Sequence, residues 1–283
     1  MLTERLHESK LDFRVVSKRI YLSGTNTIDD IPVQGQRIES HFATVREDTG
    51  DVLGIVGNRY EIIQNAEALG IADFMDGDFK HARAVDNGAI VSVALDIGNF
   101  RIGDDELNKR LFLRTSHNGS CAVEVRMQVL RVVCTNGLVA WRNKSVVKIR
   151  HTKSYQQKLA EARRVLGIAD EYYKKLNVDF QRLIETPLYP EQQQGFLDKL
   201  IGKPDASKKR DCITPTRERI LSRLHTSPDL ANHRNNAWGM YNAVAAYVDH
   251  QRGAHSSEDN QYAMRNWGTG YELKNKAFDL LMV

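Results

Sequence analysis

Three Asn-Gly dipeptides separate runs of β-forming residues in the first half of the chain. Asn-Gly readily adopts the positive φ angles of a two-residue type I′ turn, and such a turn joins two antiparallel strands. The dipeptides are Asn87-Gly88, Asn118-Gly119 and Asn136-Gly137. Their spacing predicts an antiparallel β-meander with strands over 79–85, 89–97, 110–116, 121–134 and 138–151. The third turn has an alternative, because 134–141 could instead begin a helix.

The predicted strand that begins at Cys121 shows a clear alternation of apolar and polar residues. Every second residue from Cys121 to Val129 is apolar and faces one side of the sheet. The residues between them, which include Glu124 and Arg126, face the other side. Strict alternation would then place Arg131 on the apolar side, so we expect a β-bulge after Val129.

Helical periodicity replaces this pattern after residue 153. Apolar residues spaced by three and four predict helices over 155–176, 191–201, 214–225, 235–251, 257–267 and 271–282. Before the meander, we expect two short strands over 51–63 about a turn at Gly57-Asn58, then a helix over 65–75 capped by Asn65. The sequence thus predicts an α+β fold, an antiparallel β-meander with a packed helix followed by an all-helical C-terminal region. We expect a mixed α/β domain over 1–153 and a helical domain over 154–283.

Charge is distributed unevenly along the chain. Residues 1–124 contain 14 Lys and Arg against 20 Asp and Glu, and residues 161–283 contain 18 against 16. The 36 residues between them, 125–160, contain eight basic residues and no acidic one. We call this stretch the acid-free segment. A local excess of Lys and Arg is the usual electrostatic mark of a nucleic-acid-binding surface.

Within the acid-free segment, Lys148 and Arg150 alternate with Val147 and Ile149, so one face of the predicted strand should be cationic. Such a face can follow a phosphate backbone while an aromatic ring stacks on bases. We expect Arg126, Lys148 and Arg150 to share one exposed face. The predicted nucleic-acid-binding residues are Arg126, Arg131, Trp141, Arg142, Lys144, Lys148, Arg150 and Lys153. The alternative is a solvated outer strand, or one whose cations pair with the acidic first block.

Motifs for other chemistry are weak or missing. The sequence has no phosphate-binding loop of the ATPase type and no dinucleotide fingerprint, and Gly54 to Gly57 is a GxxG match in a hairpin context. Asp249, His250 and His255 have a spacing near that of metal ligands but stand at a predicted helix end. We therefore expect no enzyme activity, no catalytic residue, no metal and no cofactor. Three widely spaced cysteines, a charged start and the lack of a long apolar run favour a cytoplasmic protein with no membrane association.

Several stretches resemble the "phage/plasmid-like protein" family, an uncharacterised family carried by phages, prophages and plasmids. They are 54–69, 131–138, 150–152 and 237–250, and they follow one another in order over most of the chain. This resemblance implies an origin in a mobile element. The architecture is also similar to that of phage single-strand annealing proteins of the Red beta and Erf kind, which assemble around DNA, although no diagnostic motif of those families is present.

These observations lead to one functional hypothesis and one alternative. The hypothesis is a single-stranded DNA-binding protein of a mobile genetic element that assists strand annealing or recombination as a homo-oligomer. The alternative is a protein-binding module that modifies host defence or regulation, in which the basic strand meets an acidic partner. The apolar face of 237–250 should pack in the core, with docking on another subunit as the alternative.

Overall fold

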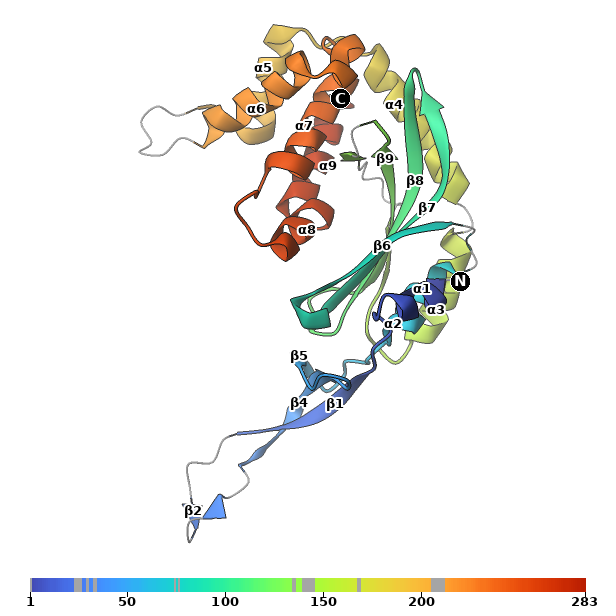
Figure 1. The fold of residues 1–283 in the computed structure, drawn as a ribbon, viewed down its shortest axis with the longest axis vertical. Coiled ribbons are helices and arrows are strands. Elements are labelled where there is room, and N and C mark those ends of the chain that lie inside the picture. The colour runs from blue at the N-terminus through green and yellow to red at the C-terminus, as the bar shows by residue number, and fades with distance from the viewer. Residues whose placement is uncertain are drawn as a thin grey trace. The chain divides into compact units, whose positions relative to one another are not determined.

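The computed structural model describes residues 2–22, 27–28, 31–32, 35–73, 75, 77–133, 136–138, 146–166, 169–204 and 212–283 (Figure 1). It is a mixed α/β structure with antiparallel sheets and a helical C-terminal region, which confirms the predicted fold class. The chain forms two compact units, each assembled from three stretches. Unit 1 contains 1–97, 111–126 and 146–168, and unit 2 contains 98–110, 127–145 and 169–283. The boundary expected after residue 153 falls inside the last stretch of unit 1.

The predicted meander is the largest sheet, with the strand order β10-β9-β8-β7-β6, and β11 pairs with β9. Its long strands appear in green in Figure 1. Strands β7, β8 and β9 each contribute residues to both units. The strands are β6 (Asp78–Val85), β7 (Ile90–Ile102), β8 (Asp105–Ser116), β9 (Val123–Arg131), β10 (Asn136–Leu138) and β11 (Val146–Ile149).

Two of the three Asn-Gly dipeptides lie in connections between strands of this meander, as predicted, but these connections, 86–89 and 117–122, are longer than the two-residue turns expected. Asn87 and Gly88 both have positive φ in the connection from β6 to β7, and Gly119 has φ +75° between β8 and β9. The third dipeptide begins the short strand β10 rather than forming a turn before it. Strands β7 and β8 are also longer than predicted, because their hairpin reverses at Gly103, where φ is +53°.

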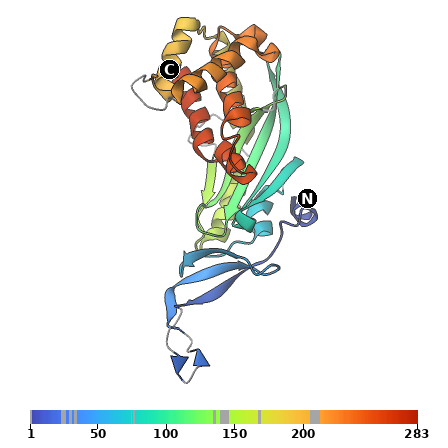
Figure 2. The same ribbon diagram turned by 60° about the vertical axis from the view of Figure 1, so that its left-hand side comes forward.

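A second, three-stranded sheet in unit 1 has the order β1-β4-β5, and Figure 2 shows these strands side by side in blue. The sequence patterns predicted only the last of them. The prediction of two short strands over 51–63 is wrong, because β5 pairs with the preceding strand β4 and no strand follows over 58–63. The elements here are α1 (Leu2–Glu8), β1 (Val15–Tyr21), β4 (Arg37–Arg46), β5 (Val52–Gly57) and the short pair β2 (Thr27–Ile28) and β3 (Ile31–Pro32).

The three-stranded sheet lies against the turn between β8 and β9. A Cβ atom at Gly54 would come within 2.5 Å of the Asn118 Cα atom, so only glycine allows this approach. Buried Thr44 donates its hydroxyl to the carbonyl oxygen of His117 at 2.7 Å. The start of this turn, at buried His117 and half-buried Asn118, is therefore packed against the three-stranded sheet, whereas Gly119 and Ser120 are exposed.

Helix α2 (Asn65–Leu69) follows, and a 3-10 turn over Gly70–Ala72 extends it. Asn65 is not its cap, since Gln64 holds that position. The Asn65 side chain is buried, donates to the carbonyl oxygen of Leu11 at 2.9 Å and lies 2.9 Å from the Nε2 atom of His117.

The helices predicted after residue 153 are present, although the long first one is two helices, α3 (Tyr155–Leu166) in unit 1 and α4 (Ala169–Glu185) in unit 2. A 3-10 helix over Pro228–His233 precedes α7, and a π-helix over Tyr247–Gln251 continues it. Within the described residues no helix is both long and apolar enough to cross a membrane. The other helices are α5 (Pro190–Ile201), α6 (Ile213–Thr226), α7 (Ala237–Ala246), α8 (Glu258–Asn266) and α9 (Thr269–Leu281).

Helix α7 forms the centre of unit 2, and all ten of its residues are buried. Trp238 and Tyr241 pack against Phe180 of α4, with ring centroids 5.0 and 6.3 Å apart. At Gly239 a Cβ atom would lie 1.9 Å from the carbonyl oxygen of His233, so the preceding 3-10 helix approaches α7 too closely for any side chain. The alternative that this apolar face docks on another subunit is therefore wrong.

Candidate nucleic-acid interface

Strand β11 positions the exposed cations of the acid-free segment. It pairs antiparallel with β9, so that Lys148 lies opposite Glu124 and Ile149 lies opposite Val123. Ile149 is buried, whereas Lys148 and Arg150 are exposed, as the alternation predicted. Lys153, just before α3, is exposed as well.

Arg126, in contrast, is not on that exposed face. It is 6% exposed and donates to the buried carboxylate of Glu124 at 2.6 Å, and Arg114 donates to the same carboxylate at 2.8 Å. Lys148 reaches the other carboxylate oxygen at 3.2 Å, with 53% of its side chain exposed. Burial alone would raise the pKa of Glu124, but the guanidinium groups of Arg126 and Arg114 lower it below its usual value. The expectation of an exposed Arg126 is wrong because Glu124 forms an internal ion cluster on β9.

Arg131 is buried in unit 2, where it is only 1% exposed. It donates to Asp105 at 2.6 Å and to Asp229 at 2.8 Å, and the Trp238 indole donates to the second oxygen of Asp105 at 2.7 Å. The register between β9 and β10 is regular from Val129 to Arg131, so the bulge expected there does not interrupt this pairing. Two carboxylates from distant parts of the sequence, rather than a bulge, accommodate the charge on the apolar side.

A long-range contact in unit 1 brings the loop after β5 beside the end of β11. The backbone N–H of Glu61 donates to the carbonyl oxygen of His151 at 3.1 Å. The rings of Tyr60 and His151 stack with centroids 4.6 Å apart and an interplanar angle of 9°. Exposed Arg59 therefore stands beside the basic end of β11. We call Arg59, Lys148, Arg150 and Lys153 the cationic junction.

Two histidines lie beneath this junction and carry no charge at neutral pH. Burial lowers the pKa of His151 to about 4. Burial, helped by the nearby His151, also lowers the pKa of His117 to about 4. The Nδ1 atom of His117 and the Nε2 atom of His151 are buried and have no hydrogen-bond partner among the residues that the structure describes. The positive charge of the junction therefore comes from its two lysines and two arginines.

Other groups near the stacked rings are not activated for chemistry. The Tyr60 hydroxyl donates to the carbonyl oxygen of Ser116 at 2.6 Å, and burial raises the pKa of Tyr60. Burial also raises the pKa of the Cys121 thiol, which disfavours the nucleophilic thiolate. Among the residues with described positions, no group of three or more His, Cys, Asp or Glu could hold a metal ion. Asp249 instead accepts from Lys274 at 2.8 Å and from the backbone of Gly137 at 2.9 Å.

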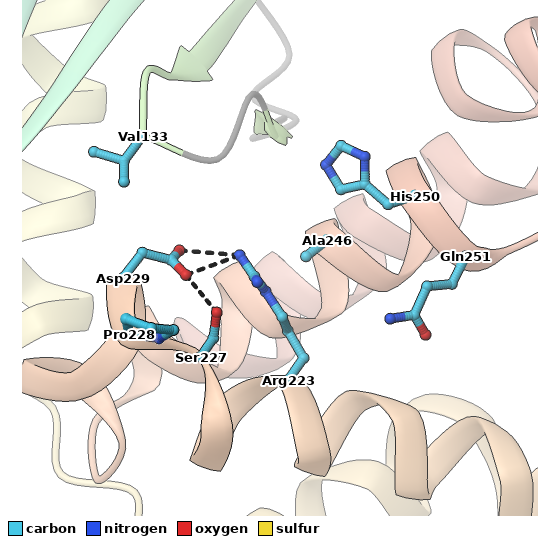
Figure 3. A pocket seen from close by; sticks show the side chains of 8 residues that line it. All are labelled: Val133, Arg223, Ser227, Pro228, Asp229, Ala246, His250 and Gln251. Carbon is cyan, nitrogen blue, oxygen red and sulfur yellow. Dashed lines mark hydrogen bonds and ion pairs between the residues drawn. The ribbon is translucent and has the colours of Figure 1, made fainter.

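Unit 2 contains a cavity of about 440 Å³, which is lined by residues that include Val133, Arg223, Asp229 and His250 (Figure 3). Arg223 approaches both carboxylate oxygens of Asp229, at 2.9 and 3.1 Å, and the Ser227 hydroxyl donates to Asp229 at 2.5 Å. Asp229 also accepts from Arg131, so its charge is shared between two guanidinium groups. This arrangement is a structural ion network with no surplus cation for a phosphate, and we assign no ligand to it.

The structure thus brings three of the eight predicted binding residues to one place, Lys148, Arg150 and Lys153. Arg126 and Arg131 are buried in ion pairs, and Trp141, Arg142 and Lys144 lie outside the described residues. Sequence reasoning missed Arg59. Its neighbour Glu61 meets His151 across 90 positions of sequence, and no local pattern signals such a contact.

Comparison with known proteins finds one family model that matches the chain, and its description states no function. The family model described as "Domain of unknown function (DUF932)" matches residues 52–267. No curated protein and no solved structure matches the chain. The match includes the meander, α2 to α8 and the whole cationic junction.

Proposed function

This chain belongs to the DUF932 family, whose description states no activity, and we propose from its own residues that it binds single-stranded DNA. In this proposal it is a non-enzymatic protein of a mobile genetic element that assists annealing or recombination. One observation carries the proposal: the cationic junction gathers Arg59, Lys148, Arg150 and Lys153 in unit 1.

The cations of the junction are available for phosphates to different degrees. In the described part of the chain, the side chains of Arg59, Arg150 and Lys153 are exposed and form no ion pair, whereas Lys148 is partly held by Glu124. Exposed, unpaired cations bind phosphate by releasing counterions and do so without sequence preference. We therefore assign the backbone contacts mainly to Arg59, Arg150 and Lys153.

Bases would stack on aromatic rings near these cations. Tyr60 is half-buried, and its ring is already held flat against His151. A ring fixed in this way loses little side-chain entropy when a base stacks on its other face. Trp141, which precedes Lys148, Arg150 and Lys153 in the same segment, is the second stacking residue in the proposal.

Four cations can contact only a few phosphates, so one copy alone should bind DNA weakly. The proposal therefore includes self-association. Tandem copies along one strand raise the effective affinity without any new contact within a copy. The rival proposal, a protein-binding module, draws on the same small footprint, because an acidic peptide could neutralise these residues equally well.

The test is the salt dependence of binding to a labelled oligothymidine, followed by fluorescence anisotropy. Four phosphate contacts predict a log–log slope of roughly −2.8, at about −0.7 per contact. Replacing Arg150 and Lys153 together by Ala should flatten the slope by roughly 1.4. The matched control is Arg101→Ala with Lys175→Ala, two exposed cations of unit 2, which should leave the slope unchanged. If the junction variant binds with the wild-type affinity and slope, the proposal is wrong and the protein-binding rival is favoured.

A further inference from the structure

The two edges of the three-stranded sheet in unit 1 are protected to very different degrees. Exposed edge strands tend to pair with other chains unless charges or irregular geometry prevent it. At one edge, β1 has Lys18 and Arg19 at its centre, and both are exposed. At the other edge, β5 reads Val-Leu-Gly-Ile-Val-Gly and contains no charge, and the register with β4 is irregular at Leu53 but regular from Gly54 to Gly57. In the described part of the chain, β5 has no partner strand on the side away from β4.

The backbone of β5 has hydrogen-bonding groups aimed at this bare edge. The N–H of Asn58 donates to the carbonyl oxygen of Ser40 on β4 at 3.0 Å. Backbone groups in an antiparallel strand alternate in direction, and the register from Gly54 to Gly57 is regular. The N–H and C=O groups of Ile55 therefore point away from β4.

Apolar side chains accompany these groups on the outer face of the sheet. Val52 is 64% exposed and Ile55 is 61% exposed, although both belong to a strand whose Leu53 and Val56 are buried. Ile55 lies opposite Ala43, which in turn lies opposite Lys18, so these three residues share the outer face.

We infer that β5 is a dimerisation edge, on which the β5 strand of a second copy pairs antiparallel about a two-fold axis at Ile55. A two-fold axis makes the same patch serve both copies, and an antiparallel strand pair has this symmetry. Ile55 would then exchange both of its backbone hydrogen bonds with Ile55 of the partner subunit. The pair extends the three-stranded sheet of one copy into a six-stranded one.

Charge complementarity at the ends of β5 favours a second copy over another apolar strand. Exposed Asp51 directly precedes β5, and exposed Arg59 lies two residues after its end. Antiparallel pairing brings the Asp51 end of one strand to the Arg59 end of the other, twice in each dimer, so Arg59 is less available to phosphate in the dimer than Arg150 and Lys153 are. Parallel pairing would place like charges together.

The interface is small, since six residues a side bury much less than the roughly 1,200 Å² of a stable complex. We therefore expect a dimer that dissociates on dilution. This inference deepens the self-association within the proposed function, but it needs no nucleic acid and is tested without it.

The experiment is sedimentation velocity over a range of protein concentrations, without nucleic acid. Wild type should pass from monomer to dimer, and Ile55→Lys should raise the dimer dissociation constant at least about tenfold, because it sets two lysines against each other. Val178→Lys, at a 70% exposed valine of α4 in unit 2, is the matched control and should dimerise like wild type. Wild type that stays monomeric at every concentration, or Ile55→Lys that dimerises like the control, overturns the inference.

Charge reversal gives a second test that leaves β5 itself unchanged. Asp51→Arg and Arg59→Asp should each weaken dimerisation about three- to tenfold, and the two together should restore it, because every reversed pair is again complementary. If the double variant is no better than the single ones, antiparallel β5 pairing is excluded. Because no DNA is present, these experiments can disprove the dimer while the oligothymidine titration still supports DNA binding. The titration can likewise disprove DNA binding while the dimer is confirmed.

Discussion

The two ends of the acid-free segment use the same residue types in opposite ways. On β9, Arg126 and Arg131 are buried and form ion pairs with carboxylates, Glu124 for one and Asp105 with Asp229 for the other. At the cationic junction, Arg150 and Lys153 are exposed, and the nearby buried groups are neutral histidines. A basic stretch in a sequence is therefore not yet a basic surface, because the fold decides which cations meet a carboxylate.

The largest effect should come from removing a buried cation of β9. Arg131→Met leaves Asp105 and Asp229 without their shared partner in a site that excludes water. Breaking a buried ion pair on one side costs about 3–5 kcal/mol of unfolding free energy. Chemical denaturation measures this loss, with Arg150→Met as the matched control at the exposed end, where the change should stay within about 0.5 kcal/mol. If Arg131→Met and Arg150→Met lost the same unfolding free energy, the two ends of the acid-free segment would not differ in their contribution to stability.

As the pH falls, protonation of His117 and His151 should destabilise the fold before the ion pairs of Glu124 and Asp229 weaken. The pKa of His117 and of His151 is about 4 when folded and about 6.5 when unfolded, so the unfolded chain binds more protons between these values. The stability that depends on the neutral rings is complete above about pH 6.5 and falls as the pH drops towards 4. The loss approaches about 3 kcal/mol for each ring. Glu124 and Asp229 have lowered pKa values, so their ion pairs weaken only at lower pH.

Denaturation at pH 7, 5.5 and 4.5 measures this loss. His151→Phe keeps a ring against Tyr60 but cannot be protonated, and it should remove about half of the pH dependence between pH 6.5 and 4.5. An unchanged dependence in this variant would show that the titrating groups lie elsewhere.

The smallest effect on stability should come from the exposed cations themselves. Arg150→Ala combined with Lys153→Ala removes no ion pair among the described residues, so the unfolding free energy should change by less than about 0.5 kcal/mol. A thermal melt beside the oligothymidine titration checks this. A large loss would mean that these residues support the fold, and the junction would then resemble β9.

Local signals in the sequence predicted the meander well, because Asn87-Gly88 and Asn118-Gly119 each mark a connection between two of its strands. They failed for β1 and β4, where residues 17–19 and 39–41 are exposed on both faces and so show no alternation between buried and exposed positions. A strand without a buried face has no pattern of period two to detect.

The prediction of the site failed for a different reason. The carboxylates that neutralise Arg131 lie 26 residues before it and 98 residues after it. Glu124 lies one position before the acid-free segment begins, so counting charges within that window missed it. Arg59 was missed because its place beside β11 depends on tertiary contacts of Tyr60 and Glu61. Lys148 and Arg150 were placed correctly because strand alternation alone exposes them.

The hydrogen bond between Asp105 and Trp238 also limits how early this part of the fold can form during translation. The two residues are 133 positions apart, and Asp229, the other partner of Arg131, is nearly as late. At about 5–20 residues per second, roughly 7 to 27 s pass between the synthesis of Asp105 and that of Trp238. During this interval Asp105 and Arg131 cannot acquire the surroundings that bury them. The charged centre of unit 2 is therefore among the last parts of the nascent chain to close.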